Sequence, residues 1–539
     1  SSCDMFARSF CFDNSGVQAR AWASRMGQGS MDQGFHNVKS CKPEDDLKDK
    51  MVVGNSDVAD VSGATFPTPL SRAALSSVIA QRRGSATLRI SEKAAEMRAA
   101  GKEVYALGFG QSPFSVPDCM VRKLREHAEV NKYLPVRGLP ELRTAIAQWA
   151  VAFKGMKVGA EDVMVGPGSK QLIYLLQAVL KCKLMLPRPS WVSYCPQAEL
   201  LGREVQWVET SEAEKWQLQA SALDAACQSA GAGAPRLIIF NNPCNPTGAA
   251  CTAEQVKALA AVARKHKLLV LSDEIYDVVQ FDGKHESFAK HYPEGTILLT
   301  GISKTSGAGG WRMGAFVFPP PLRWILDAMA VYASETHSAV SAPIQFGSLP
   351  AFRMHQNTEE AREMQHYQTA SRHILGAVGC TVAMLLNGAS GGTQYVVPPT
   401  GGFYLWVDAD LPALKTRFAS AEQMAEQLLM DTGVATLPGD AYGWDSSKLC
   451  LHMAYVDFDG AKGIEKVHEL PRFHGKDDPS GDAEWVQTYA PRVYLGAQKL
   501  REWLLKMETN GRCQGQSGEI VGDDLSKKRK SHVLYSDKP

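Results

Sequence analysis

The sequence predicts an α/β fold with a mostly parallel central sheet flanked by helices, and three observations support this. Between residues 163 and 320, short apolar runs alternate with amphipathic helical patterns, as expected for parallel strands joined by right-handed crossovers. Thr252-x-x-Gln255 is a capping box that opens a helix predicted over 253–266. Beyond residue 395, further strand patterns flank one helix, which predicts a second, smaller α/β domain.

Each remaining element follows from its own pattern, in chain order. Helical periodicity predicts helices before the sheet over 72–82, 91–100 and 140–149. Apolar runs predict strands of the main sheet over 163–165, 184–186, 237–240, 268–271 and 296–299. The smaller domain is predicted from strands over 402–407 and 449–456, a helix over about 420–430 and a last helix over 493–507. The polar segment 457–490 is predicted to be a loop-like insertion.

Composition divides the chain into five predicted parts. Residues 1–66 are rich in Ser, Gly, Asp and Lys without periodicity, so we expect a leader or disordered arm. The following parts are an N-terminal segment of the small domain (67–130), a large domain (131–394), a small C-terminal domain (395–508) and a polar basic tail (509–539). The arginines near the start fit an organelle transit segment or an untargeted leader. The basic cluster 527–530 fits a solvated tail or a nuclear signal.

The charge balance and the cysteines exclude several classes of function. Lys and Arg number 58 against 57 Asp and Glu, so a net charge of +1 gives no field that would attract nucleic acid or an anionic membrane. No run approaches the roughly 18 apolar residues of a membrane-spanning helix. The 12 cysteines show no C-x-x-C pair and no metal-like spacing with histidine. We therefore expect reduced thiols, no metal, and an intracellular protein of the cytoplasm or of an organelle such as a mitochondrion or plastid.

Chemistry is predicted where three strands of the main sheet end. Asn245, Asp273 and Lys304 follow three predicted parallel strands, and ligands of such sheets bind beyond the carboxyl ends of the strands. A lysine there can form a Schiff base with an aldehyde cofactor whose phosphate is held by Arg312. A buried Asp273 would keep a pyridine nitrogen protonated. Asn245 and Tyr276 could donate hydrogen bonds to a ring oxygen.

Further motifs occur in the same order as in one known family. They are Tyr133-Leu-Pro-Val-Arg-Gly138, Gly166-Pro-Gly-Ser-Lys170, Pro189-Ser-Trp-Val-Ser-Tyr194, Asn241-Asn-Pro-Cys-Asn-Pro-Thr-Gly248, Ser272-Asp-Glu-Ile-Tyr276 and Gly301-Ile-Ser-Lys304. With them the chain resembles a fold-type I, pyridoxal-phosphate-dependent aminotransferase of class I/II, similar to the aspartate and aromatic aminotransferases, over about residues 85–456.

The resemblance implies a cofactor, pyridoxal 5'-phosphate, and a set of residues that bind it. Those residues are Tyr133, Ser169, Lys170, Trp191, Asn245, Asp273, Tyr276, Ser303, Lys304 and Arg312. It implies that Ser169 and Lys170 lie where a helix start cups the phosphate and that Trp191 stacks on the ring. It also implies a homodimer, because the tyrosine at position 133 reaches the phosphate of the partner subunit. Lys304, Asp273 and Tyr276 are the implied catalytic residues.

The implied reaction is a ping-pong transfer of an amino group from an L-amino acid to a 2-oxo acid, with 2-oxoglutarate as the expected acceptor. The expected amino-acid partner is aspartate-like, aromatic or methionine-like. In the resemblance, Gly110 belongs to the loop whose amide contacts the substrate carboxylate. The other implied substrate-binding residues are Asn245 and His452.

The chain departs from the family at one substrate contact. Relatives usually carry an arginine on a late strand, in a pattern like Arg-x-Ser-Phe-Ala, that pairs with the substrate carboxylate. Here His452, or with a two-residue slip Cys450, stands in its place. A histidine is single-pronged and only partly charged at neutral pH, so it replaces a guanidinium poorly.

Three interpretations therefore stay open. The first is an aminotransferase. The second is a β- or γ-eliminating lyase that uses the same cofactor, which net amino transfer to an oxo acid would exclude. The third is a catalytically impaired structural homologue, against which the retention of Lys304, Asp273 and Arg312 argues.

Overall fold

The computed structural model describes residues 86–229, 235–388, 393–476 and 478–515. The chain divides into two compact units, 1–70 and 71–539, and every described residue lies in the second. The predicted leader, the helix over 72–82 and the basic cluster 527–530 lie outside the described residues.

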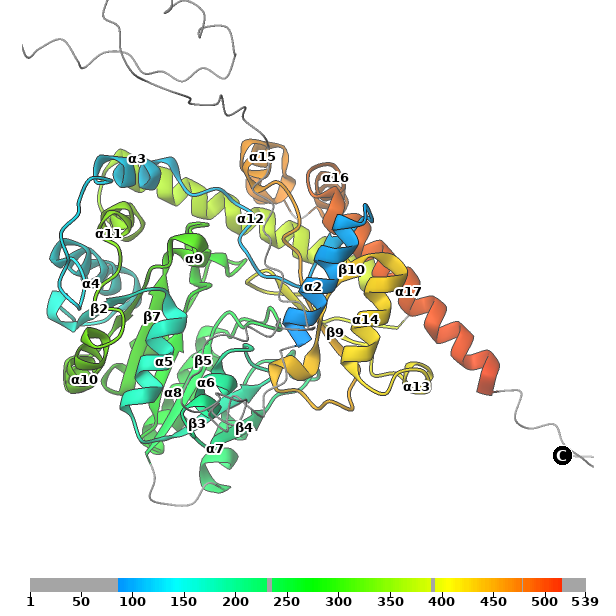
Figure 1. Cartoon of the computed structure of the whole chain (residues 1–539), viewed down its shortest axis with the longest axis horizontal. Coiled ribbons are helices and arrows are strands. Elements are labelled where there is room, and N and C mark those ends of the chain that lie inside the picture. The colour runs from blue at the N-terminus through cyan, green and yellow to red at the C-terminus, as the bar shows by residue number, and fades with distance from the viewer. Residues whose placement is uncertain (1–85, 230–234, 389–392, 477, 516–539) are drawn as a thin grey trace, which may run out of the picture. The chain divides into compact units, whose positions relative to one another are not determined.

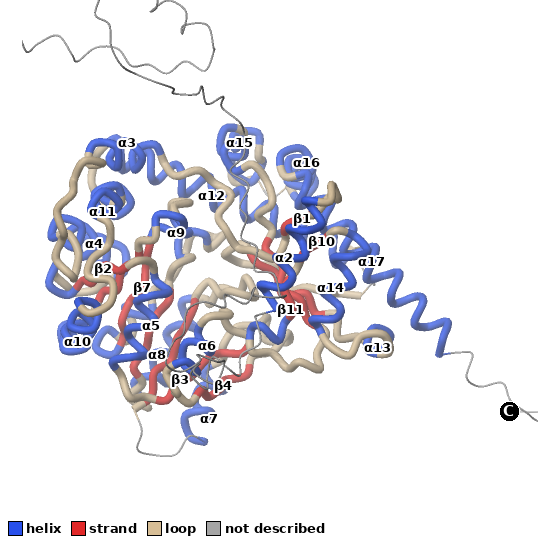
Figure 2. Tube along the Cα trace, in the orientation of Figure 1, coloured by secondary structure: helices blue, strands red, loops and turns tan. Residues whose placement is uncertain are grey.

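A seven-stranded sheet forms the larger layer of the fold, in the order β2-β8-β7-β6-β5-β3-β4 (Figures 1 and 2). Its strands are β2 (Val163–Gly166), β3 (Lys183–Arg188), β4 (Val205–Glu209), β5 (Arg236–Asn241), β6 (Leu269–Asp273), β7 (Thr296–Gly301) and β8 (Gly314–Val317). β8 alone runs in the direction opposite to the other six strands. The prediction of an α/β fold on a mostly parallel sheet is therefore confirmed.

The five predicted strands of this sheet are all present, and two strands were missed. β4 lies at the sheet edge, where only Val208 is buried, so polar residues interrupt its apolar run. β8 has four residues and starts at a glycine, which is too short for a periodic signal. It fits between β2 and β7 because all four of its residues are buried.

Helices cover the sheet and connect its strands. Before the second sheet they are α2 (Ala86–Ala99), α3 (Asp118–Glu126), α4 (Pro140–Lys154), α5 (Ser169–Val179), α6 (Tyr194–Leu200), α7 (Ala220–Ser229), α8 (Ala253–Lys265), α9 (Ile302–Thr305), α10 (Arg323–Ser334), α11 (Ala342–Gly347) and α12 (Glu359–Asn387). The capping box that predicts α8 is present, because Thr252 Oγ1 accepts from Gln255 N at 3.3 Å and Gln255 Oε1 accepts from Thr252 N at 2.8 Å.

The 29-residue helix α12 was not predicted. By length and composition it could cross a membrane, but 67% of its most apolar 18-residue window is buried inside the fold. Its buried residues contact α16 and α17, so it acts as a core helix here.

A three-stranded antiparallel sheet, β11-β12-β9, forms the second layer of strands. It comprises β9 (Tyr404–Asp408), β11 (Leu437–Pro438) and β12 (Cys450–Ala454), with α13 (Pro412–Lys415) and α14 (Ala421–Thr432) between β9 and β11. The N-terminal β1 (Tyr105–Ala106) pairs in parallel with β10 (Val434–Ala435). α2 lies beside α14 (Figure 1), so the N-terminal segment packs on C-terminal elements. The domain boundaries at 130, 394 and 508 stay a prediction.

The prediction that 457–490 is a loop was wrong. The segment contains α15 (Gly460–Glu465), two short 3-10 helices and α16 (Pro479–Tyr489), followed by α17 (Pro491–Gly515). Trp485 is 4% exposed, and its Nε1 donates to Lys466 O at 3.1 Å. Arg472 and Asp482 form an ion pair at 2.8 Å. The helices are short and bury at most two large apolar residues each, so no periodic pattern is visible in the sequence.

Replacing Trp485 by alanine tests whether this segment belongs to the core. We expect Trp485→Ala to lower the free energy of unfolding by about 3–5 kcal/mol, because a large buried side chain leaves a cavity. Trp324, which is 60% exposed on α10, provides the matched control, and Trp324→Ala should change the value by about 0.5 kcal/mol or less. Urea titrations measure both, and equal losses would contradict the packing of α16.

Candidate active site

The strand ends that carry the predicted chemistry meet at one edge of the sheet. In the register of the parallel strands, Asn241 at the end of β5 faces Asp273 at the end of β6, and Asp273 faces Leu299 of β7. Asn245 follows β5 by four residues, and Lys304 lies on α9, which begins directly after β7. The structure therefore brings Asn245, Asp273 and Lys304 to the same edge.

Lys304 is a lysine whose amine is partly deprotonated near neutral pH. Burial, and secondarily the positive charge of Arg312, lower its pKa to about 8. Its Nζ donates to the carbonyl oxygen of Gly110 and lies 5.2 Å from the ring centroid of Phe403. An amine with this pKa can act as a nucleophile.

Asp273 is a buried carboxylate with few partners. It is 4% exposed, and it accepts from Tyr194 Oη at 2.5 Å and from Ile275 N at 3.2 Å. Burial raises its pKa to about 6, while the hydrogen bond from Tyr194 acts in the opposite direction. At pH 7 this carboxylate is mostly ionised, and a cationic group such as a protonated ring nitrogen would stabilise it. Tyr194 was not predicted as a site residue, although it ends the motif that contains Trp191.

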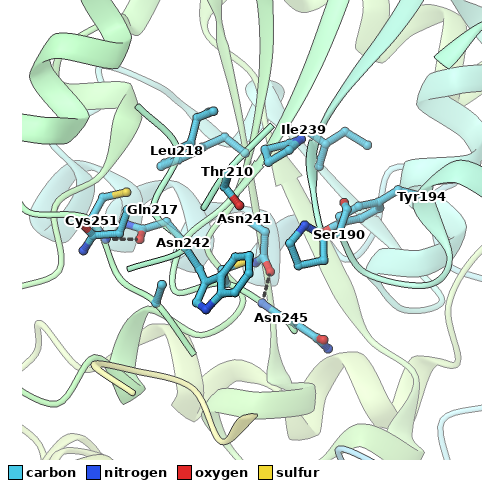
Figure 3. A pocket seen from close by; sticks show the side chains of 16 residues that line it. Ser190, Tyr194, Thr210, Gln217, Leu218, Ile239, Asn241, Asn242, Asn245 and Cys251 are labelled. Atoms are coloured by element: carbon cyan, nitrogen blue, oxygen red, sulfur yellow. Dashed lines mark hydrogen bonds between the residues drawn. The ribbon is translucent and has the colours of Figure 1, made fainter. Parts of the chain in front are cut away.

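Tyr276 belongs to a pair of buried tyrosines. Its hydroxyl lies 2.7 Å from that of Tyr404, which the sequence analysis missed, and burial raises the pKa of Tyr276 well above its ordinary value. Interaction with Asn245 lowers that pKa again. Among the described residues nothing pairs with the buried Oδ1 of Asn245. Figure 3 shows Asn245 at the border of a pocket, with its backbone N–H donating to Asn241 Oδ1 at 2.8 Å.

An anion-binding cradle lies at the start of α5. Gly168 has φ +86°, and a Cβ there would stand 2.3 Å from Nη2 of Arg312. A Cβ on Gly314 would stand 2.5 Å from the backbone N of Ser169. Only glycines leave room for the guanidinium beside this helix N-terminus, where unpaired N–H groups and the helix dipole favour an anion. Lys170 adds a further charge, and burial together with Arg312 lowers its pKa.

The remaining predicted cofactor residues differ in their solvent exposure. Trp191 is half-buried, packs edge-on against Tyr194 at 5.1 Å, and lies 5.1 Å from Lys170 Nζ. Ser303 is half-buried on α9 beside Lys304. Tyr133 is 97% exposed, so its own chain does not pack it among the other site residues.

Gly110 lies against Lys304 and Tyr404. Its carbonyl accepts from the lysine, and a Cβ at this position would stand 2.1 Å from Tyr404 Oη. Position 110 therefore requires glycine.

His452 is fully buried rather than partly charged. It is 1% exposed on β12 and packs in tilted contacts against Tyr442 at 4.5 Å and Tyr404 at 5.0 Å between ring centroids. Burial lowers its pKa to about 3, so the imidazole is neutral at pH 7, which corrects the expectation of partial charge. Neither ring nitrogen has a partner among the described residues. A neutral imidazole does not provide the positive charge with which an arginine would pair with the substrate carboxylate.

The alternative position, Cys450, provides no cation either. It is buried, and burial raises the pKa of its thiol. Lys448, two residues before Cys450, pairs with Asp410 at 2.8 Å.

In the described part of the chain, no group of three His, Cys, Asp or Glu side chains could hold a metal ion.

A family model confirms what the geometry indicates. The description "Aminotransferase class I and II" matches residues 102–457. The chain belongs to the class I and II aminotransferases. The predictions of this family, of its fold type and of a transaminase are thereby confirmed.

Individual relatives agree with this assignment. Aspartate aminotransferase from Bacillus subtilis is 32% identical over 402 residues, which cover 72% of this chain and 97% of that protein. Asparagine–oxo-acid transaminase from Streptococcus mutans is 29% identical over 370 residues, covering 67% and 89%. The structure of aspartate aminotransferase from Thermus thermophilus with maleate is similar, with a TM-score of 0.63 and 26% identity over 76% of this chain and 99% of that one.

The depressed pKa of Lys304 predicts a pH dependence. The rate at which the protein forms an adduct with pyridoxal, which lacks a phosphate, should rise with pH to a midpoint near 8, because the neutral amine reacts. Arg312→Gln should move the midpoint to higher pH, because a positive charge that lowers the lysine pKa is removed. Arg323→Gln, on α10, is the control and should leave it unchanged. A midpoint near the ordinary lysine value of about 10.4 would contradict this assignment.

Proposed function

We propose that this aminotransferase uses pyridoxal 5'-phosphate and transfers the amino group of an aspartate-like L-amino acid to 2-oxoglutarate. The observation that carries the proposal is the half-buried Lys304, with a pKa of about 8, at the same end of the sheet as the buried Asp273. The names of the relatives, aspartate aminotransferase and asparagine–oxo-acid transaminase, support the choice of donor.

The residues present fit this cofactor. The glycine cradle beside Arg312 and Ser169 suits a phosphate, and Lys170 and Ser303 are its proposed further contacts. Asp273 would pair with the ring nitrogen and Trp191 would cover the ring face. The side-chain NH2 of Asn245 and the hydroxyl of Tyr276 are the proposed donors to the ring oxygen.

When bound, pyridoxal phosphate supplies an aldehyde that binds amines and a ring that accepts electrons. Lys304 would hold the resting cofactor and, once displaced by the substrate amine, would take the proton from the substrate Cα. Asp273 would keep the ring nitrogen protonated and Tyr276 would orient the ring oxygen. Removal of Lys304 would therefore abolish both attachment and proton transfer.

The substrate side of the proposal rests on Gly110, Asn245 and His452. Because His452 is neutral and packed against two tyrosines, β12 would hold the substrate carboxylate without a cation. The Asn245 amide and the glycine-containing loop at residue 110 would then make the polar contacts. We expect weaker carboxylate binding than an arginine fork would give.

The active unit is proposed to be a homodimer in a reducing, intracellular compartment. The exposed Tyr133 supports a role across a subunit interface. Eight of the described cysteines are free thiols, in keeping with the reducing compartment that we propose. A large domain over 131–394 and a small one over 395–508 remain part of the proposal.

Absorbance spectra test the function directly. With pyridoxal phosphate, the wild-type protein should show the band of a lysine–cofactor adduct, and L-aspartate should convert it to the absorbance of the amine form of the cofactor. Adding 2-oxoglutarate should restore the first band. Lys304→Ala should show neither change, because its side chain has no amine. Release of ammonia from the amino acid, with the first band restored without 2-oxoglutarate, would instead indicate a lyase.

Mixing two inactive variants tests the role of Tyr133. In a heterodimer of Lys304→Ala and Tyr133→Ala, one of the two sites has both wild-type residues if the tyrosine acts across the interface. Randomly reassorted subunits should recover about a quarter of wild-type activity, since half of the dimers are mixed. No recovery above the separate variants would contradict a shared site.

A further inference from the structure

A buried ionic cluster lies behind the turn that carries Asp273 and Tyr276. Lys154, the last residue of α4, is 3% exposed, and its Nζ lies 2.9 Å from Glu274 Oε2 and 2.6 Å from Asp277 Oδ2. Both carboxylates are buried as well, Glu274 at 1% and Asp277 at 7% exposure. One lysine therefore holds two residues of this turn.

The turn divides its side chains between two environments. Asp273 bonds to Tyr194, and Tyr276 contacts Tyr404. The residues that directly follow them in sequence, Glu274 and Asp277, contact Lys154 instead. A displacement of Glu274 or Asp277 would therefore move the backbone that carries the two predicted catalytic side chains.

The carboxylate of Glu274 has further polar partners besides Lys154. Its Oε1 accepts from Ser272 Oγ at 2.8 Å and from Ser287 Oγ at 2.7 Å, and His285 Nε2 lies 2.9 Å from its Oε2. Burial acts to raise the pKa of Glu274, but Lys154 and His285 outweigh it and hold the pKa well below its ordinary value. The carboxylate is therefore an anion at neutral pH, directly beside Asp273.

The charge behind the turn affects Asp273. Besides burial, the negative charge of Glu274 raises the pKa of Asp273, and Lys154 balances that charge. The other titratable groups that face Asp273 are Tyr194, Tyr276 and Cys244, whose pKa values are all raised, so they are neutral at pH 7. Lys154, together with His285, thus offsets the negative charge of Glu274 on this side of Asp273.

Three buried charges are a costly way to stabilise a core, because an apolar set of similar volume is often as stable or more so. We propose that Lys154 is a positioning residue for the reaction: it fixes Glu274 and Asp277 from behind the turn and balances their charge, so that Asp273 remains an anion for the cofactor ring nitrogen. The inference rests on the proposed function, since it assumes that pyridoxal phosphate binds at Asp273.

The test is the pH dependence of the dissociation constant of pyridoxal phosphate between pH 5 and 8, measured by quenching of tryptophan fluorescence. In the wild-type protein the affinity should fall as Asp273 becomes protonated, near pH 6. Lys154→Gln should move this midpoint up by about one pH unit, because a compensating cation is lost. Glu274→Gln should move it down, because a neighbouring anion is lost. Lys154→Arg should restore the wild-type midpoint.

Opposite shifts are a result that a merely structural role would not produce. If both variants change the dissociation constant equally at every pH, or shift the midpoint in the same direction, the proposal is wrong. Should Lys154→Gln be recovered unfolded, the double variant Lys154→Gln/Glu274→Gln decides the question, because its midpoint should lie above that of Glu274→Gln alone; equal midpoints would overturn the role of Lys154. If the wild-type protein does not bind pyridoxal phosphate at all, the proposed function fails, whereas unchanged midpoints in binding-competent variants overturn only the role of Lys154.

Discussion

The register of three parallel strands is the constraint on which the site depends. Asn241, Asp273 and Leu299 stand side by side because β5, β6 and β7 are hydrogen-bonded in parallel. Asn245, Tyr276 and Lys304 follow the ends of these strands by only three or four residues of chain. A slip of one residue would turn Asp273 to the other face of the sheet. The wholly buried strand β7 makes such a slip costly, since its side chains are packed on both faces.

Burial then gives the site its reactivity. The same desolvation that lowers the pKa of Lys304 to about 8 raises that of Asp273 to about 6, so their values approach neutral pH from opposite sides. The amine becomes available as a nucleophile while the carboxylate remains an anion. Tyr194 stabilises the anion from the site side and the cluster around Lys154 supports the turn from behind. Aromatic side chains around them exclude water, which strengthens each of these interactions.

Sequence reasoning predicted the residues at strand ends because parallel topology places them without further information. It also recognised the glycine cradle, since Gly168, Ser169 and Arg312 belong to motifs with fixed order. It missed Tyr404, Tyr442 and Lys154, whose positions depend on how distant elements pack: α4 and β9 approach the sheet edge only in the folded chain. The neutral state of His452 could not be predicted either. It depends on contacts with Tyr404 and Tyr442, which leave no pattern in the sequence around position 452. The helices of segment 457–490 were missed because their buried apolar residues are few. Helix α12 was missed because its residues 374–379 are buried on every side, so no single apolar face gives a period.

Transfer of the amino group itself is the central claim, and following the nitrogen tests it most directly. The purified protein, with pyridoxal phosphate, is incubated with ¹⁵N-labelled L-aspartate and unlabelled 2-oxoglutarate, and the products are followed by nuclear magnetic resonance. We expect ¹⁵N to appear in glutamate with the wild-type protein, and not with Lys304→Ala. Label that is released as ammonia, or glutamate formed equally well by the variant, would contradict it.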